Sequence, residues 1–310
     1  MKRPFCIILS LLLLCCLCSC AAPAEPSEKL HIVSAIFPSY DFARQVCGDR
    51  AEVSLLIPPG NEIHGYEPSL DDIAILSDCD IFIYAGGESD SWTTDIIAAS
   101  ENNDITVLSM LDLVDACTAE HTEGMESHHN HDHKELDEHV WTSPKNAALI
   151  TRAICDSACS EDPANTAFYR KNTADYTALL TELDADYTAA LSNAENNFLV
   201  FADRFPFRYL AEEYRLEYDA AFSGCSSDTE PSLAAIAHLI DKVKETGSKA
   251  VFYIEFSDTT VAEMIAEATD TKAMMLHSCQ NVTQEDFNSG ATYLGLMQRN
   301  LETLKEALNR

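Results

Sequence analysis

Short apolar runs alternate with helical repeats along most of this chain, and the alternation restricts the fold more than any other feature. The runs at 53–57 and 250–256 have the length and the β-branched or aromatic content of strands. A single amphipathic stretch separates most consecutive runs, which favours parallel sheets covered by helices. The expected strands are 31–36, 53–57, 80–85, 105–108, 198–201, 250–256 and 273–276.

One helical stretch is much longer than the others. From Asp162, followed by Pro163, apolar residues keep helical spacing to about Asn193, which corresponds to roughly 45 Å of helix. We therefore predict an α/β protein with two similar lobes, each a mostly parallel sheet covered by helices. The predicted lobes are residues 31–155 and 198–310, and one long connecting helix lies within 156–197.

The amino terminus has the form of an export signal. Two basic residues precede an apolar run at 5–17 that is too short to span a bilayer permanently. The sequence Leu17-Cys18-Ser19-Cys20 resembles a lipobox, so we predict a signal peptide at 1–19, lipid attachment at Cys20 and a tether at 20–30. Ordinary cleavage after Ala21 or Ala22 is the alternative. The expected location is extracytoplasmic, anchored to the cell membrane as a lipoprotein.

Charge and cysteine content exclude several classes of function. The chain has 20 basic and 51 acidic residues, and without Lys2 and Arg3 the net charge is −33, which argues against nucleic acid or anionic lipid surfaces as partners. Five of the 12 cysteines lie in the leader or at its cleavage point. The remaining seven form no CxxC pair, which leaves a Cys₄ zinc site unsupported. A disulfide between Cys225 and Cys279 is one option, and buried free thiols are the other.

Three histidines follow predicted strands or lie in loops that the fold would bring together. His64 comes after the strand at 53–57, His139 lies at the start of the sequence His-Val-Trp-Thr-Ser-Pro, and His277 ends the strand at 273–276. In open parallel sheets, ligands bind beyond the carboxyl ends of the strands. We therefore expect the three imidazoles to share one metal ion in a cleft between the lobes.

Four features in this order resemble the zinc- and manganese-binding lipoproteins of ABC importers, the cluster A-I metal-binding proteins. They are the segment 59–68, the segment 137–144, the acidic histidine-rich stretch between them and the long connecting helix. The resemblance implies extracytoplasmic capture of a metal ion as transported cargo, without catalysis. It also implies an ABC transporter permease and its ATPase as partners.

The resemblance assigns two ligands directly and leaves two uncertain. His64 and His139 occupy the first two histidine positions of the family. The third position falls on Ala202 or on Arg204, depending on the direction of counting, so Asp203 between them is the only plausible donor. His277 stands in the place of the family's late carboxylate. Three imidazoles and one carboxylate favour Zn²⁺, whereas Mn²⁺ prefers more oxygen ligands.

The stretch 120–138 is polar and rich in histidine, which predicts a loop with weak accessory metal binding. Its histidines are His121, His128, His129, His131 and His133. An extracellular zinc-dependent hydrolase is an alternative function, with Glu62 and Glu255 as candidate bases, although no HExxH or GxSxG motif is present. An adhesin lipoprotein stiffened by its metal is a third alternative.

Overall fold

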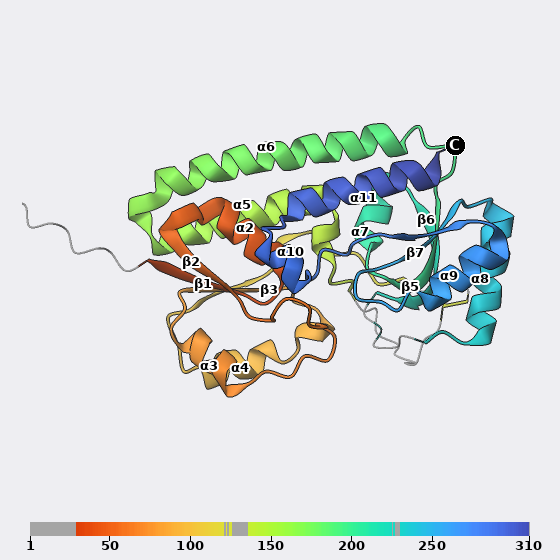
Figure 1. The fold of residues 1–310 in the computed structure, drawn as a ribbon. Helices are drawn as coiled ribbons and strands as arrows, with labels where there is room; N and C mark the ends of the chain where they lie inside the picture. Colours follow the sequence, from red (N-terminus) through yellow and green to blue (C-terminus); the bar gives the residue numbers. More distant parts are fainter. Residues whose placement is uncertain are drawn as a thin grey trace, which may run out of the picture.

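The structure is a computed structural model that describes residues 29–120, 122, 124–125, 136–224, 226 and 230–309. Within these ranges the chain forms two four-stranded parallel sheets with helices packed around them (Figure 1). We call the sheet of the first half with its helices the first lobe, and the sheet of the second half with its helices the second lobe. The predicted architecture of two similar α/β lobes is therefore confirmed.

The first lobe has the strand order β2-β1-β3-β4. All three neighbouring pairs are parallel, so the carboxyl ends of the strands lie at one edge. A reciprocal capping box between Ser69 and Asp72 begins α3 and fixes the chain after the loop that contains His64. The elements are β1 (Leu30–Ser34), α2 (Phe37–Cys47), β2 (Ala51–Leu55), α3 (Leu70–Ser77), β3 (Ile81–Tyr84), α4 (Thr93–Ala99) and β4 (Thr106–Ser109).

The second lobe repeats this arrangement with the order β6-β5-β7-β8. Its strand β6 was not predicted from the sequence. The pairing of β5 with β6 is irregular: Phe201 pairs with Ala220 and Arg204 with Phe222, so β5 carries one additional residue between the two pairs. The elements are β5 (Phe198–Phe205), α7 (Arg208–Tyr214), β6 (Glu217–Ser223), α8 (Leu233–Thr246), β7 (Ala250–Tyr253), α9 (Thr260–Thr269), β8 (Lys272–Met275) and α10 (Gln284–Asn288).

Two long helices connect the lobes. Helix α6 (Thr166–Leu191) extends along both of them, and α11 (Tyr293–Leu308) lies beside it (Figure 1). The long helix begins later than its predicted range, because α5 (Pro144–Glu161) ends before it and a short 3₁₀ turn at Pro163–Asn165 separates the two. At 26 residues, α6 is roughly 39 Å long.

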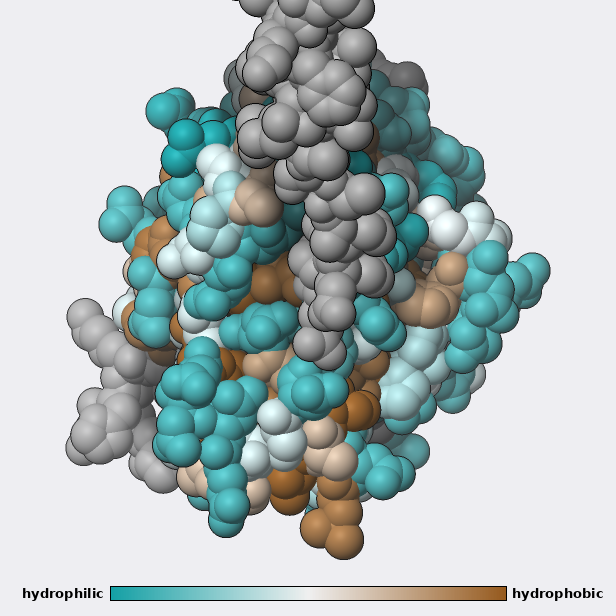
Figure 2. All heavy atoms as spheres, turned by 90° about the vertical axis from the view of Figure 1, so that its left-hand side faces the viewer, coloured by the Kyte–Doolittle hydropathy of each residue, from teal (hydrophilic) through white to brown (hydrophobic). Residues whose placement is uncertain are grey.

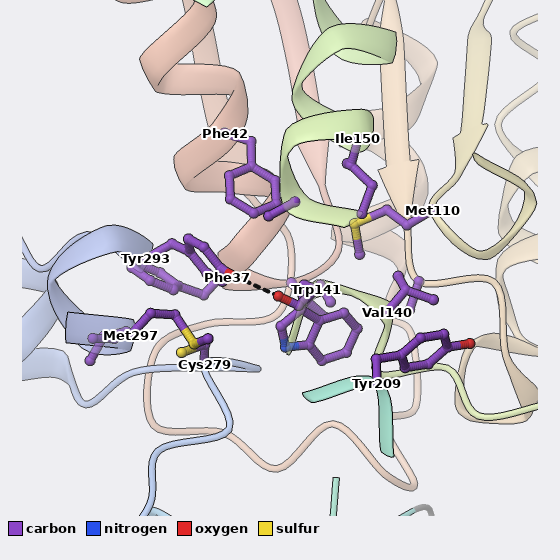
Figure 3. Packing of buried hydrophobic residues seen from close by; sticks show 14 of the residues in the cluster. Phe37, Phe42, Met110, Val140, Trp141, Ile150, Tyr209, Cys279, Tyr293 and Met297 are labelled. Atoms are coloured by element: carbon purple, nitrogen blue, oxygen red, sulfur yellow. Dashed lines mark hydrogen bonds between the residues drawn. The ribbon is translucent and has the colours of Figure 1, made fainter. Parts of the chain in front are cut away.

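One hydrophobic core extends through both lobes, and a smaller one lies within the second lobe. Trp141, in a 3₁₀ turn at Val140–Thr142, is among the largest fully buried side chains of the larger core. Around this tryptophan lie Phe37, Phe42 and Met110 of the first lobe, and Tyr209, Cys279, Tyr293 and Met297 of the second half of the chain (Figure 3). A shared core of this kind favours a fixed arrangement of the lobes over a wide hinge.

Figure 2 shows the end of the molecule formed by the first lobe, where hydrophilic residues cover most of the surface and apolar residues lie among them. Within the ranges that the structure describes, no helix has both the length and the apolar character needed to cross a bilayer. Cys279 is a buried free thiol in this structure, and Cys225, its predicted disulfide partner, lies outside the described residues.

A buried carboxyl group joins α2 to α11, and its removal gives a stability prediction. Asp41 is fully buried, and it accepts hydrogen bonds from the backbone N–H of Tyr293 at 2.9 Å and from Gln45 Nε2 at 3.2 Å. Burial raises the pKa of Asp41 above its ordinary value, although the two hydrogen bonds and Arg44 oppose the rise. A carboxyl group with a raised pKa stabilises the fold at low pH, and this contribution is lost as the pH rises through its folded pKa.

We therefore expect Asp41→Asn to gain stability relative to the unsubstituted chain as the pH rises. The amide retains an acceptor for Tyr293, and Gln45 can turn its own amide to accept from the new NH₂ group. The gain should be largest near neutral pH and above, and should shrink toward zero near pH 4. Urea unfolding followed by circular dichroism at several pH values measures it. A variant less stable by the same amount at every pH would contradict the prediction.

Candidate metal centre

Three loops of the first lobe meet at the carboxyl edge of its sheet. One follows β2 and carries His64, the second follows β3 and carries Gly87 and Ser89, and the third, at 137–143, leads into α5. Parallel strands bring such loops together, as expected from the sequence. His64 and His139 therefore lie close in space although 75 positions separate them, with their ring centroids 6.0 Å apart.

His64 is held as a neutral imidazole. Its ring is only 5% exposed, and Nδ1 lies 2.6 Å from the hydroxyl oxygen of Ser89. Burial, together with the electrostatic effect of His139 and Arg204, lowers the pKa of His64 to about 3, although Glu62 and Asp137 oppose the shift. A metal ion binds only the unprotonated ring, so His64 needs no proton release before it ligates.

His139 has the environment of a metal-ligating histidine. The ring is fully buried, and Nδ1 lies 3.0 Å from Oδ1 of Asp137, which also accepts the backbone N–H of His139. Burial opposes a charge on this ring, but the Asp137 carboxylate raises the pKa of His139 above its ordinary value. With Nδ1–H donating to Asp137, the lone pair of Nε2 is left free, and this buried atom has no hydrogen-bond partner.

Glu138 supplies an oxygen beside the two rings. One carboxylate oxygen, Oε2, accepts the backbone N–H of Ser89 at 3.2 Å. The other, Oε1, is buried without a hydrogen-bond partner and lies 3.9 Å from Nδ1 of His64. Gly87 makes this position possible, since a Cβ atom there would lie 2.0 Å from Oε2 of Glu138.

These three side chains form a group that could hold a cation. One ligand atom from each of His64, Glu138 and His139 lies within 4.8 Å of the others. Bonds of about 2.0–2.2 Å in a tetrahedral zinc site place donors roughly 3.3–3.6 Å apart, so a modest contraction would close the group around an ion. Two nitrogen donors and one oxygen donor leave one position open. Unsatisfied buried polar atoms are costly, and a bound cation would satisfy both orphan atoms.

His277 does not belong to this group. It follows β8 as predicted and is buried, but Nδ1 accepts the backbone N–H of Cys279 at 2.9 Å and lies 3.5 Å from Oε2 of Glu255. In a neutral ring with Nδ1 accepting, the proton is on Nε2, so neither nitrogen is free in this arrangement. Ligation by His277 therefore stays a prediction that requires the ring to change its hydrogen bonds.

Asp203 is also outside the group. Its Oδ1 accepts the backbone N–H of Arg204 at 2.7 Å, and its Oδ2 accepts that of Ile254 at 3.3 Å. Both carboxylate oxygens thus stabilise the irregular segment of β5. The assignment of Asp203 as a ligand stays a prediction as well, and the structure gives this carboxylate a backbone-binding role.

Glu138 was not among the ligands predicted from the sequence. A signal was present, because Glu138 is adjacent to His139 in an acidic pair that precedes the buried turn at Val140–Thr142. The sequence does not give the direction of the Glu138 carboxylate, because that direction depends on the hydrogen bond from Ser89 and on the space beside Gly87. The predicted lipidation residue and accessory ligands, Cys20, His121, His128, His129, His131 and His133, lie outside the described residues.

The comparison with protein families gives one clear match. The model of the family described as zinc-uptake complex component A, periplasmic (ZnuA), matches residues 32–307. The zinc-binding lipoprotein AdcA of Streptococcus pneumoniae R6 is 32% identical over 310 aligned residues, which cover 96% of this chain and 61% of the relative. The high-affinity zinc uptake system protein ZnuA of Bacillus subtilis 168 is 30% identical, over 91% of this chain and 88% of that protein. The chain thus spans about three fifths of the length of AdcA.

Solved structures agree with this match. The zinc-bound ZnuA-like domain of Streptococcus pneumoniae AdcA superimposes with a TM-score of 0.74 at 31% identity, covering 91% of this chain and 100% of that domain. The metal-dependent lipoprotein YcdH of Bacillus subtilis gives a TM-score of 0.76 at 31% identity, covering 90% of this chain and 99% of that one. From residue 32 to residue 307, in sequence and in fold, this chain belongs to the family of zinc-uptake complex component A.

Proposed function

We propose that this protein captures a zinc ion outside the cytoplasm and delivers it to an ABC importer made of a permease and an ATPase. The observation that supports this most directly is the pair of buried, partnerless atoms, His139 Nε2 and Glu138 Oε1, beside the neutral ring of His64. Imidazole nitrogens with one carboxylate oxygen suit zinc better than manganese, whose sites are richer in oxygen. The names of AdcA and ZnuA state zinc binding and zinc uptake for those relatives.

The proposed location is the outer face of a cell membrane, where a diacylglycerol on Cys20 holds the protein near its permease. The lipobox-like Leu17-Cys18-Ser19-Cys20 supports this anchor, and AdcA is named a lipoprotein. With the lipid on Cys20, the tether at 20–30 joins the folded lobes to the membrane. The large negative charge favours the approach of cations to the folded part of the chain.

The hydrolase alternative loses both of its candidate bases in this structure. Glu62 forms an ion pair with Arg204 at 3.0 Å, and Glu255 binds the backbone N–H and the hydroxyl group of Ser278. A general base must be free to accept a proton near the attacking water. Membership of a transport family also points away from catalysis. We therefore propose that the metal in this cleft is cargo and not a catalytic cofactor.

Zinc titration of the purified chain tests the proposal. We expect one site with a Kd below about 1 μM, measured by competition with a chromophoric chelator, and much weaker binding of manganese. Additional, weaker binding by the histidines of 121–133 would raise the stoichiometry without replacing the tight site. Absence of any site in this range, or a preference for manganese, would contradict the proposed function.

A further inference from the structure

Arg204 places a buried positive charge in the cleft next to the candidate ligands. It lies near the carboxyl end of β5, directly after the irregular pairing with β6, and its side chain is only 6% exposed. Its Nη2 donates to Oε2 of Glu62 at 3.0 Å, while Nε has no hydrogen-bond partner. A guanidinium group cannot ligate a cation and remains charged at every physiological pH.

The partner of this charge belongs to the other lobe. Glu62 is in the loop that carries His64, and its second oxygen, Oε1, accepts the backbone N–H groups of Ile63 at 3.1 Å and His64 at 3.4 Å. The ion pair of Glu62 with Arg204 therefore joins this loop to the second lobe. Asp203 is a poor substitute as a partner, because its oxygens bind backbone N–H groups and Oδ1 is 3.9 Å from Nε of Arg204.

The guanidinium group lies close to both candidate ligand rings. Its partner Glu62 accepts the backbone N–H of His64, and a Cβ atom at Gly224 would lie 2.9 Å from the carbonyl oxygen of Phe205, the residue after Arg204, and 3.0 Å from Cε1 of His139. A divalent cation between the two rings is therefore repelled by the buried charge of Arg204.

We propose that Arg204 and Glu62 form a charge pair that sets the affinity of this cleft for its cation. Arg204 weakens binding of the ion, and Glu62 offsets part of that repulsion from the opposite lobe. The proposal rests on the proposed function and adds a residue that determines affinity without touching the metal. With Arg204 present, the site releases its ion more readily than a site with the same three protein ligands and no nearby positive charge. Delivery to an importer requires such release.

Opposite substitutions at the two positions should move the zinc affinity in opposite directions. We expect Arg204→Gln to bind zinc about tenfold more tightly, and Glu62→Gln about tenfold more weakly, because each removes one sign of charge near the ion. The double variant should return to within about threefold of the unsubstituted chain, and Arg204→Lys should retain its affinity. Chelator competition at fixed pH and ionic strength measures all four dissociation constants.

Arg208→Gln is the matched control. Arg208 is also partly buried in the second lobe and paired with acids, with Nη1 2.8 Å from Oε2 of Glu212 and Nε 3.4 Å from Oε2 of Glu120, but neither of these partners is in the loop that carries His64. Its zinc affinity should stay within about twofold of the unsubstituted chain. Far-UV circular dichroism and urea unfolding establish that each variant is folded. If Arg204→Gln does not fold, Arg204→Lys and Glu62→Gln still carry the test.

Several results would overturn the inference. Unchanged or weaker zinc binding by folded Arg204→Gln would show that its charge does not oppose the ion. A double variant as weak as Glu62→Gln alone would identify Glu62 as a direct ligand and refute a charge pair. Failure of the unsubstituted chain to bind zinc would refute the proposed function together with this inference, whereas zinc binding that no substitution alters would refute the inference alone.

Discussion

Replacement of His139 by alanine is expected to lower the zinc affinity of the cleft by about 100-fold or more. Zinc sites with four protein ligands have apparent binding free energies of about 10–16 kcal/mol, so one ligand contributes roughly 3 kcal/mol. His139 offers a fully buried nitrogen with no competing partner. His64→Ala should cause a loss of the same order, and the double variant should lose the tight site. Competition with a chromophoric chelator measures each dissociation constant.

Two further variants make this prediction specific. Asp137→Asn leaves the ligands in place but weakens the hold on Nδ1 of His139, so a smaller loss of about 10–100-fold is expected. His31→Ala is the control, because this ring bonds the carbonyl of Asp78 at 2.7 Å, at the opposite end of β1 from the site. Its zinc affinity should not change. Equal affinity in His139→Ala and the unsubstituted chain would place the metal elsewhere.

The fold was largely predictable because strands and helices alternate with clear boundaries. Strand β6 was missed because Glu217 and Asp219 interrupt its apolar pattern. Asp219 is nevertheless buried, where it is hydrogen-bonded to His238 Nε2 at 3.2 Å and forms an ion pair with Lys242 Nζ at 3.8 Å. Those partners come from α8, and no local pattern reveals them. Helix α5 had local signals, since Ser143 caps it and Pro144 opens it.

The site was predictable where residue type alone decides the chemistry. His64 and His139 came together because the carboxyl ends of parallel strands converge. The placement of Glu138, Asp203 and His277 depends instead on which backbone N–H group each side chain meets, and this is a property of the packed structure. Counting along the sequence left the third ligand position of the family at either Ala202 or Arg204. The additional residue in β5 lies between Phe201 and Arg204, and in the structure Arg204 is paired with Glu62.

Trp141 connects the candidate metal centre to the core shared by the lobes. Its ring is fully buried and contacts the ring of His139 edge-on, with centroids 5.4 Å apart. Its Nε1 donates to the carbonyl oxygen of Ser278 at 2.9 Å, and its own carbonyl accepts from the hydroxyl group of Tyr293 at 2.5 Å (Figure 3). Both partners belong to the second half of the chain, so this residue stabilises the arrangement of the lobes as well as the site.

Trp141→Ala should therefore lower the free energy of unfolding by about 3–5 kcal/mol, because it leaves a large cavity and an unpaired carbonyl group at Ser278. Trp141→Phe should cost less, since it retains most of the buried area. Trp92→Ala is the control: this half-buried ring packs on Tyr66 and donates no hydrogen bond, so a loss below about 2 kcal/mol is expected. Urea unfolding followed by far-UV circular dichroism measures all three. Equal losses in Trp141→Ala and Trp92→Ala would refute a special role for Trp141, since both substitutions remove the same side chain and only one removes the link between the lobes.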